Sequence, residues 1–284
     1  MEFSLRRVGE ENIYYYDSGR ESSLQLVFLP GSLNPGLWKH QLRYFSKKYR
    51  TISFRPTESS RDFAGEKEAL ENVLSQKDVD NVVLVSNVFG NPLAQEFESH
   101  EKVMSTVLTG ALRGDTMLVS KSFYRVFRGV IVKKPKLLKK LLFSDSTDYR
   151  IVKEFAQELE APDFSDLMSF AERYSVSPPS KNSMIVYSEN DPLSSIPFSA
   201  KTDKTSLSYI KRAGTFSFYE KPQEYNKALH DFLTRLEGLV EEEEIEKARK
   251  RNRSLLEFEE EDKSSTDSGQ KMLSEKDREK VKIR

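Results

Sequence analysis

The sequence predicts an α/β protein whose mostly parallel central sheet is flanked by helices. Short apolar runs of strand length alternate with longer segments of helical periodicity, a pattern typical of parallel sheets. The runs are apolar without strict alternation, as expected of strands that are covered on both faces. The alternation stops over residues 113–178, whose helical patterns predict a cap inserted into the sheet domain.

The first half of the chain contains five of the expected strands and three helices between them. The run LQLVFLPG at 24–31 is typical of a buried strand that ends in a Pro-Gly turn. The segment 91–102 begins with Asn91 and Pro92, which favours a helix start because Asn can cap a helix and Pro fits its first position. We expect strands at 12–19, 24–31, 50–56, 81–86 and 103–111, and helices at 36–49, 65–78 and 91–102.

The second half contains two further strands, at 183–191 and 206–214, and a final helix that begins at Pro222. These elements complete one sheet domain around the inserted cap. We expect this sheet domain to comprise residues 1–112 and 179–236, the helical cap 113–178, and a charged C-terminal extension 237–284.

The C-terminal extension is dominated by charge, with 15 acidic and 12 basic side chains among its 48 residues. Strong helix formers over 235–263 predict a helix with a thin apolar stripe, and the polar remainder predicts disorder. Such a segment either docks on a protein partner or is a solvated extension, and the sequence leaves both readings open.

The expected cap contains a basic segment. Residues 116–143 hold eight Lys or Arg and no acid. Apolar residues share one helical face, so the segment is either a lid over a pocket or a basic surface for an anionic membrane. It lacks the aromatic and Arg spacing of a known nucleic-acid module, so nucleic acid is not an expected partner.

Composition excludes several classes of site. The chain has 284 residues, a formal net charge of +0 and no cysteine. Disulfides, zinc–thiolate sites and cysteine nucleophiles are therefore excluded, and the balanced charge indicates no class of partner. The first residues lack the apolar core of a signal peptide, and no apolar run is long enough to span a bilayer. We expect a cytoplasmic protein with no cofactor and no metal.

Four segments carry a family resemblance: VFLPGSLNPGLWKHQL at 27–42, LVSNVFGNPLAQEF at 84–97, MIVYSENDPLSS at 184–195 and IKRAGTFSFYEKPQEYNKALHDFL at 210–233. In order and spacing they resemble the α/β-hydrolase fold, specifically its capped branch of esterases, lipases and haloperoxidase-like enzymes. The likeness covers about residues 12–236. The first segment is similar to the family's strand, His-Gly loop and helix, with Pro30 in place of the usual His.

The resemblance assigns chemistry to three positions. Val88 takes the nucleophile position of the G-x-S-x-G elbow, Asp191 that of the acid, and Thr215 that of the catalytic His. The family reaction needs a hydroxyl, thiol or carboxylate at the elbow and an imidazole that accepts its proton. Val88 has no nucleophilic atom, and Thr215 has no group that titrates near neutral pH. We therefore predict a degenerate triad.

The remaining histidines and nearby serines offer no replacement. His40, His100 and His230 are expected to be structural, because none falls where the resemblance places the imidazole. Ser32 and Ser86 lie near the site by resemblance, but neither has an evident base beside it.

The backbone of the elbow does not depend on the Val88 side chain. By resemblance, an oxyanion hole would use the N–H of Phe89 and one from Ser32 or Leu33. With the helix N-terminus behind them, these groups predict a pocket for a carboxylate, carbonyl or lipid-like ligand. The alternative is that the Val88, Phe89 and Leu33 side chains fill the pocket.

The predicted function is therefore binding without catalysis. We expect a protein partner, reached through the C-terminal extension, or a small apolar or anionic ligand under the cap. Two alternatives remain: an active esterase-like hydrolase with displaced catalytic residues, and a peripheral membrane protein that binds anionic lipid through the basic cap. Hydrolysis of an ester by the intact protein would favour the first of these alternatives.

Overall fold

The computed structural model describes residues 3–9, 11–31, 33–57, 60, 62–110, 134–158, 180–191, 203–242 and 245. Contacts within the chain divide it into two units, Met1–Phe232 and Leu233–Arg284. The boundary lies a few residues before the expected start of the C-terminal extension. The sheet and the helices that cover it belong to the first unit.

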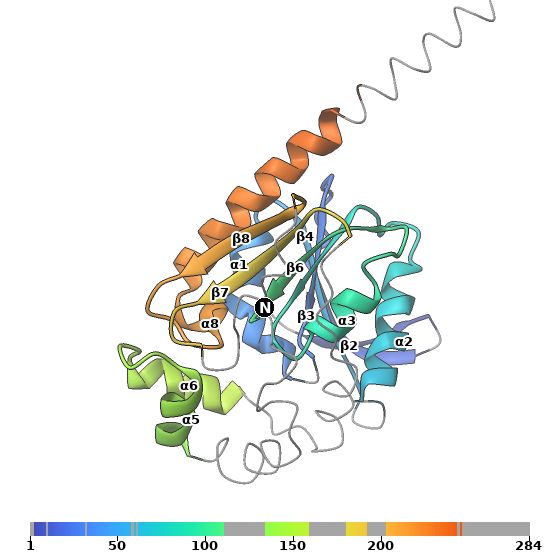
Figure 1. The fold of residues 1–284 in the computed structure, drawn as a ribbon. Coiled ribbons are helices and arrows are strands. Elements are labelled where there is room, and N and C mark those ends of the chain that lie inside the picture. The colour runs from blue at the N-terminus through green and yellow to red at the C-terminus, as the bar shows by residue number, and fades with distance from the viewer. Residues whose placement is uncertain are drawn as a thin grey trace, which may run out of the picture. The chain divides into compact units, whose positions relative to one another are not determined.

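The first unit is built on an eight-stranded sheet with the order β1-β2-β4-β3-β5-β6-β7-β8 (Figure 1). The strands β1 and β2 pair antiparallel, and β2 pairs antiparallel with β4. Every other pairing is parallel, which confirms the predicted mostly parallel sheet. The strands are β1 (Ser4–Val8), β2 (Glu11–Asp17), β3 (Gln25–Leu29), β4 (Arg50–Pro56), β5 (Val82–Ser86), β6 (Val103–Thr109), β7 (Ser183–Ser188) and β8 (Thr205–Ile210).

Seven of these strands match the expected ones, with ends that are mostly shorter. Every residue of β3, β4 and β5 is buried, as predicted for central strands covered on both faces. The strand β1 was not predicted, because its burial pattern is exposed until its last residue and no apolar run marks it. It forms one edge of the sheet.

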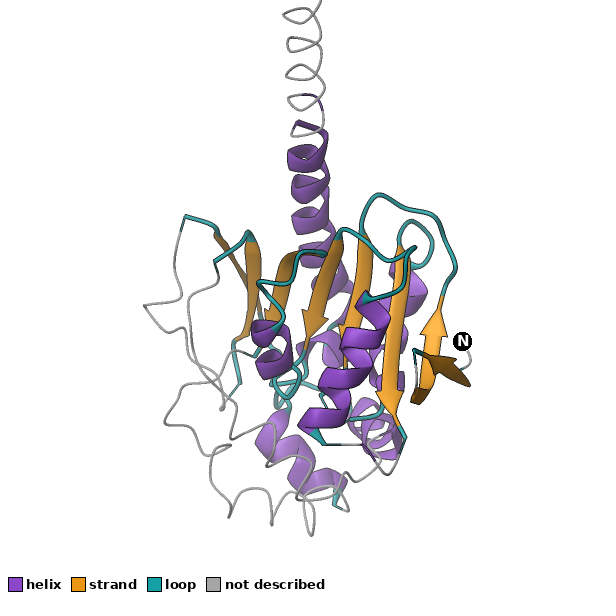
Figure 2. Cartoon of the chain, turned by 90° about the vertical axis from the view of Figure 1, so that its right-hand side faces the viewer, coloured by secondary structure: helices purple, strands orange, loops and turns teal. Residues whose placement is uncertain are grey.

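Helices cover both faces of the sheet. In Figure 2, α2 and α3 lie on the face toward the viewer, and α1 and α8 lie on the opposite face. The described helices are η1 (Pro35–Trp38), α1 (Lys39–Phe45), α2 (Phe63–Leu74), α3 (Asn91–Glu96), α5 (Pro135–Leu142), α6 (Tyr149–Glu158), α8 (Ser217–Glu220) and the C-terminal helix, residues 222–242.

Two helices lie within the interval that was expected to form the cap. The helices α5 and α6 belong to it, whereas 111–133 and 159–179 lie outside the described residues. The hairpin of α5 and α6 is joined to the segment after β8, because the Thr215 N–H donates to the carbonyl of Leu142 at 2.9 Å. The boundaries of the cap and its role as a lid stay predictions.

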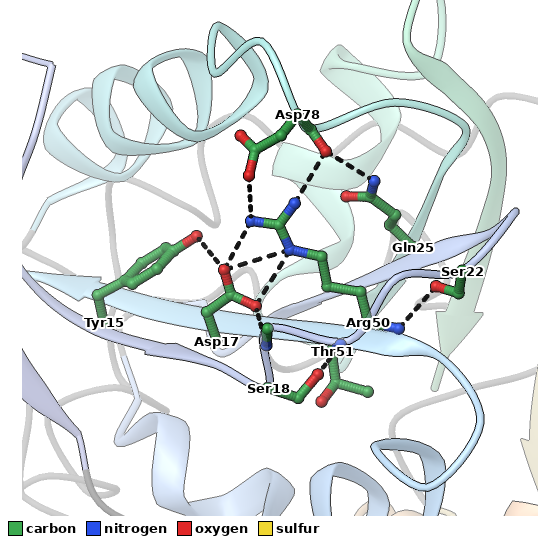
Figure 3. Close-up of polar contacts among 9 residues, drawn as sticks. Tyr15, Asp17, Ser18, Ser22, Gln25, Arg50, Thr51 and Asp78 are labelled. Carbon is green, nitrogen blue, oxygen red and sulfur yellow. Dashed lines mark hydrogen bonds and ion pairs between the residues drawn. The ribbon is translucent and has the colours of Figure 1, made fainter.

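An ionic network joins the start of β4 to its neighbours (Figure 3). The Arg50 guanidinium bonds Asp17 at 2.7 Å and the Asp78 carboxylate at 2.9 Å, and it also donates to the Asp78 carbonyl at 2.8 Å. Arg50 and Asp17 are nearly buried, with 10% and 11% of their side chains exposed. One side chain thus connects β2, β4 and the loop after α2.

Within the described ranges, no helix has the length and apolar character needed to cross a membrane.

Candidate functional site

The turn between β5 and α3 is organised by Asn87. The Asn87 Oδ1 accepts from the N–H groups of Phe89 and Gly90, at 2.9 and 3.0 Å, and its Nδ2 donates to the Pro30 carbonyl at 3.0 Å. Asn87 therefore holds the turn through its side chain, whereas the N-cap of α3 is Gly90, which has no side-chain cap. Val88 follows Asn87 and is 2% exposed.

Asn91 has a different role from the predicted one. Its Nδ2 donates to the Thr109 carbonyl at 3.1 Å, and its Oδ1 accepts from the Ser86 hydroxyl at 2.6 Å. It lies inside α3 and joins the ends of β5 and β6, while Pro92 occupies the first turn as expected.

The three positions singled out by sequence come together at the carboxyl ends of the strands. The Thr215 hydroxyl donates to Asp191 Oδ1 at 2.6 Å. A Cβ on Gly110, which follows β6, would lie 3.4 Å from Asp191 Oδ2 and 3.5 Å from the Val88 Cβ. The same point is 3.8 Å from the Thr215 carbonyl oxygen. Val88, Asp191 and Thr215 therefore surround Gly110.

The polar side chains of this site are buried. Asp191 is 9% exposed and Thr215 is 2% exposed. Burying a polar pair is tolerated when its members bond each other, as these two do. The Thr215 hydroxyl thus supplies the hydrogen bond to Asp191 that an imidazole N–H supplies in a Ser-His-Asp arrangement, without a basic nitrogen.

The donors predicted for an oxyanion hole are only partly described. The Phe89 N–H already donates to Asn87 within the turn, so a ligand would have to displace that bond. Leu33 is fully buried, and Ser32 lies outside the described residues. At the predicted ligand site of Ser32, Leu33 and Phe89, the Phe89 N–H is therefore already used within the turn.

Aromatic rings occupy the space between the turn and the α5–α6 hairpin. The Phe216 ring centroid lies 6.5 Å from that of Phe89, 6.1 Å from that of Phe143 and 4.5 Å from that of Phe155. All four side chains are at most 4% exposed. Their packing resembles a protein core more than an open pocket.

A buried carboxylate supports the segment that carries Thr215. Glu220 accepts from the N–H groups of Ser144, at 3.1 Å, and Gly214, at 2.7 Å, and from the Thr147 hydroxyl. Burial raises the pKa of Glu220, although these hydrogen bonds act in the opposite direction. Glu220 therefore ties the loop before α8 to the α5–α6 hairpin.

The other candidate residues have structural partners. The Ser86 hydroxyl donates to Asn91, and a second contact joins it to the Val107 carbonyl at 3.2 Å. The His100 Nδ1 accepts from the Lys102 N–H at 3.1 Å. The His40 ring lies edge-on to Tyr219, 5.3 Å between centroids. Within the described part of the chain, no group of three or more His, Asp or Glu could hold a metal ion.

Solved structures with the same architecture identify the fold. A thermophilic esterase from Thermogutta terrifontis superposes with a TM-score of 0.61 at 17% identity, covering 83% of this chain and 98% of that one. A bromoperoxidase from Bacillus anthracis gives a TM-score of 0.64 at 15% identity, covering 82% and 100%.

The chain has the α/β-hydrolase fold. The enol-lactonase from Burkholderia xenovorans LB400, with a TM-score of 0.62 at 12% identity over 81% of this chain and 100% of that one, extends the same likeness. No protein-family model matches the sequence. No curated protein matches it either. The likeness to α/β-hydrolases therefore concerns the fold, as the sequence motifs predicted.

Sequence reasoning missed two residues of this candidate site. Gly110 lies at its centre but belongs to no motif that the resemblance used. Asn87 holds the turn, but it falls at an unspecified position of the G-x-S-x-G motif, which therefore gave no signal for its role.

Proposed function

We propose that this protein is a non-catalytic α/β-hydrolase-fold protein that acts by binding. The proposal rests on one observation: the buried Val88 lies at the β5–α3 turn beside the Thr215–Asp191 hydrogen bond. A valine cannot attack a carbonyl carbon, and a threonine hydroxyl bonded to a carboxylate cannot act as imidazole does. The two groups that handle the proton in this family are thus replaced.

The site's surroundings favour a protein partner over a small ligand at the turn. The Phe89 N–H, which would stabilise an oxyanion, is engaged by Asn87. The rings of Phe89, Phe143, Phe155 and Phe216 pack against one another where a substrate would need space. A small apolar or anionic ligand under the cap would need these rings to separate.

The second candidate is an esterase-like hydrolase with displaced catalytic residues. Its support is that the structural neighbours are an esterase, a bromoperoxidase and a lactonase. That support is at the level of the fold, and α/β-hydrolase-like folds host many functions. The hydroxyl nearest in sequence, that of Ser86, bonds Asn91 and has no imidazole partner among the described residues.

Ester hydrolysis separates the two candidates. We expect the protein to hydrolyse p-nitrophenyl acetate and butyrate no faster than Val88→Ala does, because neither protein has a nucleophile at the turn. The double variant Val88→Ser with Thr215→His, measured beside them, reports whether the frame still accepts a triad with Asp191. Turnover by the unmodified protein that is lost on changing one serine or histidine would overturn the proposal.

A further inference from the structure

A second site lies where α1 approaches the start of the C-terminal helix. A cavity of about 260 Å³ opens between these two segments. It is lined by His40, Arg43, Tyr44, Lys47, Pro222, Gln223 and Asn226. His40, Arg43, Tyr44 and Lys47 follow one another at intervals of three, one and three residues, so they share one side of α1 and its continuation. All seven belong to the first unit of the chain.

The cavity is electropositive. Two cations and a histidine line it, and no acidic residue does. Arg43 and Lys47 are exposed, and neither forms an ion pair with any residue that the structure describes. Burial, followed by the charges of Lys39 and Arg43, lowers the pKa of His40, although Glu154 and Glu158 of α6 act in the opposite direction.

Asn226 places an amide donor at this cavity. Its side chain accepts from Gln41 Nε2 at 3.0 Å through Oδ1. Asn226 is only 6% exposed, and across the described ranges nothing accepts a hydrogen bond from its Nδ2. Among the described residues this nitrogen is not one of the fully buried side-chain atoms that lack a partner, so it keeps some contact with solvent and is available to a ligand in the cavity that Asn226 lines.

The N-terminal backbone of the helix that begins at Pro222 adds to the positive electrostatic potential at the cavity. Residues 222–242 form a helix that begins at Pro222, so its positive end faces this region. The N–H groups of the first turn, at Gln223 and Glu224, have no acceptor within the helix. Helix ends of this kind favour anions.

We propose that this cavity binds a small phosphate-bearing anion, either a free phosphate monoester or a phosphorylated headgroup. Arg43 and Lys47 neutralise the charge, and Asn226 Nδ2 donates a hydrogen bond. Tyr44 and Pro222 supply apolar walls for the group that carries the phosphate. This site is separate from the β5–α3 turn, so binding there does not depend on whether the protein hydrolyses esters.

Titration of the full chain with inorganic phosphate tests the proposal. The chain has three histidines, so the ring resonances of His40 can be followed by NMR. We expect a saturable shift of the His40 signals and an affinity that falls about tenfold or more in Arg43→Gln, because a charge-assisted bond is lost. Lys77→Gln removes an exposed charge elsewhere and should leave the affinity unchanged.

Asn226→Asp provides a second, nearly isosteric test. It keeps an oxygen for Gln41 but replaces the amide donor with a negative charge, so it should abolish the shift of the His40 signals. If Asn226→Asp fails to fold, the phosphate affinity of Arg43→Gln tests the proposal instead. Vesicles with phosphatidic acid distinguish the two sources, since a headgroup site would bind them in an Arg43-dependent way. An unchanged His40 signal at saturating phosphate, or equal binding by Arg43→Gln, overturns the proposal.

Discussion

At the scale of single residues, Arg50 connects three parts of the first unit through one guanidinium group (Figure 3). Burial alone would raise the pKa of Asp17, but hydrogen bonds from Arg50 and from the Gly19 N–H hold it below its usual value. Such a carboxylate stabilises the fold at pH values above its unfolded-state pKa. The contribution is lost as pH falls through the folded-state pKa.

This linkage predicts the behaviour of Asp17→Asn. At neutral pH the variant should lose about 2 kcal/mol of unfolding free energy, because Arg50 keeps only Asp78 as a charged partner. The difference from the unmodified protein should shrink as pH falls below about 4. Urea unfolding across that pH range measures both effects.

Asp148→Asn is the matched control. Asp148 pairs with Arg150 on the surface at 2.9 Å, and exposed pairs contribute little to stability, so no measurable change is expected. A difference between Asp17→Asn and the unmodified protein that stays constant into acid would contradict the linkage.

The residues of the candidate site show what sequence can predict at this scale. Val88, Asp191 and Thr215 were chosen from motifs far apart in the chain, and they meet because the carboxyl ends of parallel strands share one edge. The Asn87 bond to the Phe89 N–H was not predictable from the motif, since it depends on a side-chain rotamer within the turn.

At the scale of elements, the close approach of two turns positions the site. A Cβ on Gly31, after β3, would overlap the backbone of Phe89 and Gly90. Gly31 also has φ +63°, in the left-handed region that favours glycine. The loop after β3 and the turn after β5 can pack together only because this residue has no side chain.

Gly31→Ala and Gly19→Ala separate the two effects of such a change. Gly19 has φ +64° but open space around it, so its alanine variant should lose only the backbone term of about 1–2 kcal/mol. Gly31→Ala adds a steric clash and should lose about 1–3 kcal/mol more of the unfolding free energy. Thermal or urea unfolding provides the comparison, and equal losses would mean that the contact with the turn is not required.

Elements were predictable wherever their apolar pattern was strong. The central strands follow from buried runs such as VVLVS in β5. The edge strand β1 was missed because most of its residues face solvent, and a strand defined by pairing alone leaves no hydrophobic signal. The predicted helix at 36–49 instead begins as η1, where the Asn34 side chain accepts from the Gly36 N–H at 2.8 Å.

At the scale of the whole molecule, a shared fold does not by itself imply a shared activity. The chain superposes on enzymes over about four fifths of its length, yet its sequence is at most 17% identical to the three compared above. The order of strands and turns was predictable because it is encoded in patterns of burial. The function of the assembled protein is set by a few side chains that those patterns do not constrain.

Reaction of the full chain with a fluorophosphonate probe, followed by intact-mass spectrometry, tests the central claim most directly. The probe forms a covalent adduct with a serine only when a base activates it. We expect the mass to stay unchanged, because the resemblance places Val88 at the position of the nucleophile and Thr215 at that of the base. An adduct on any serine of the unmodified protein would contradict it.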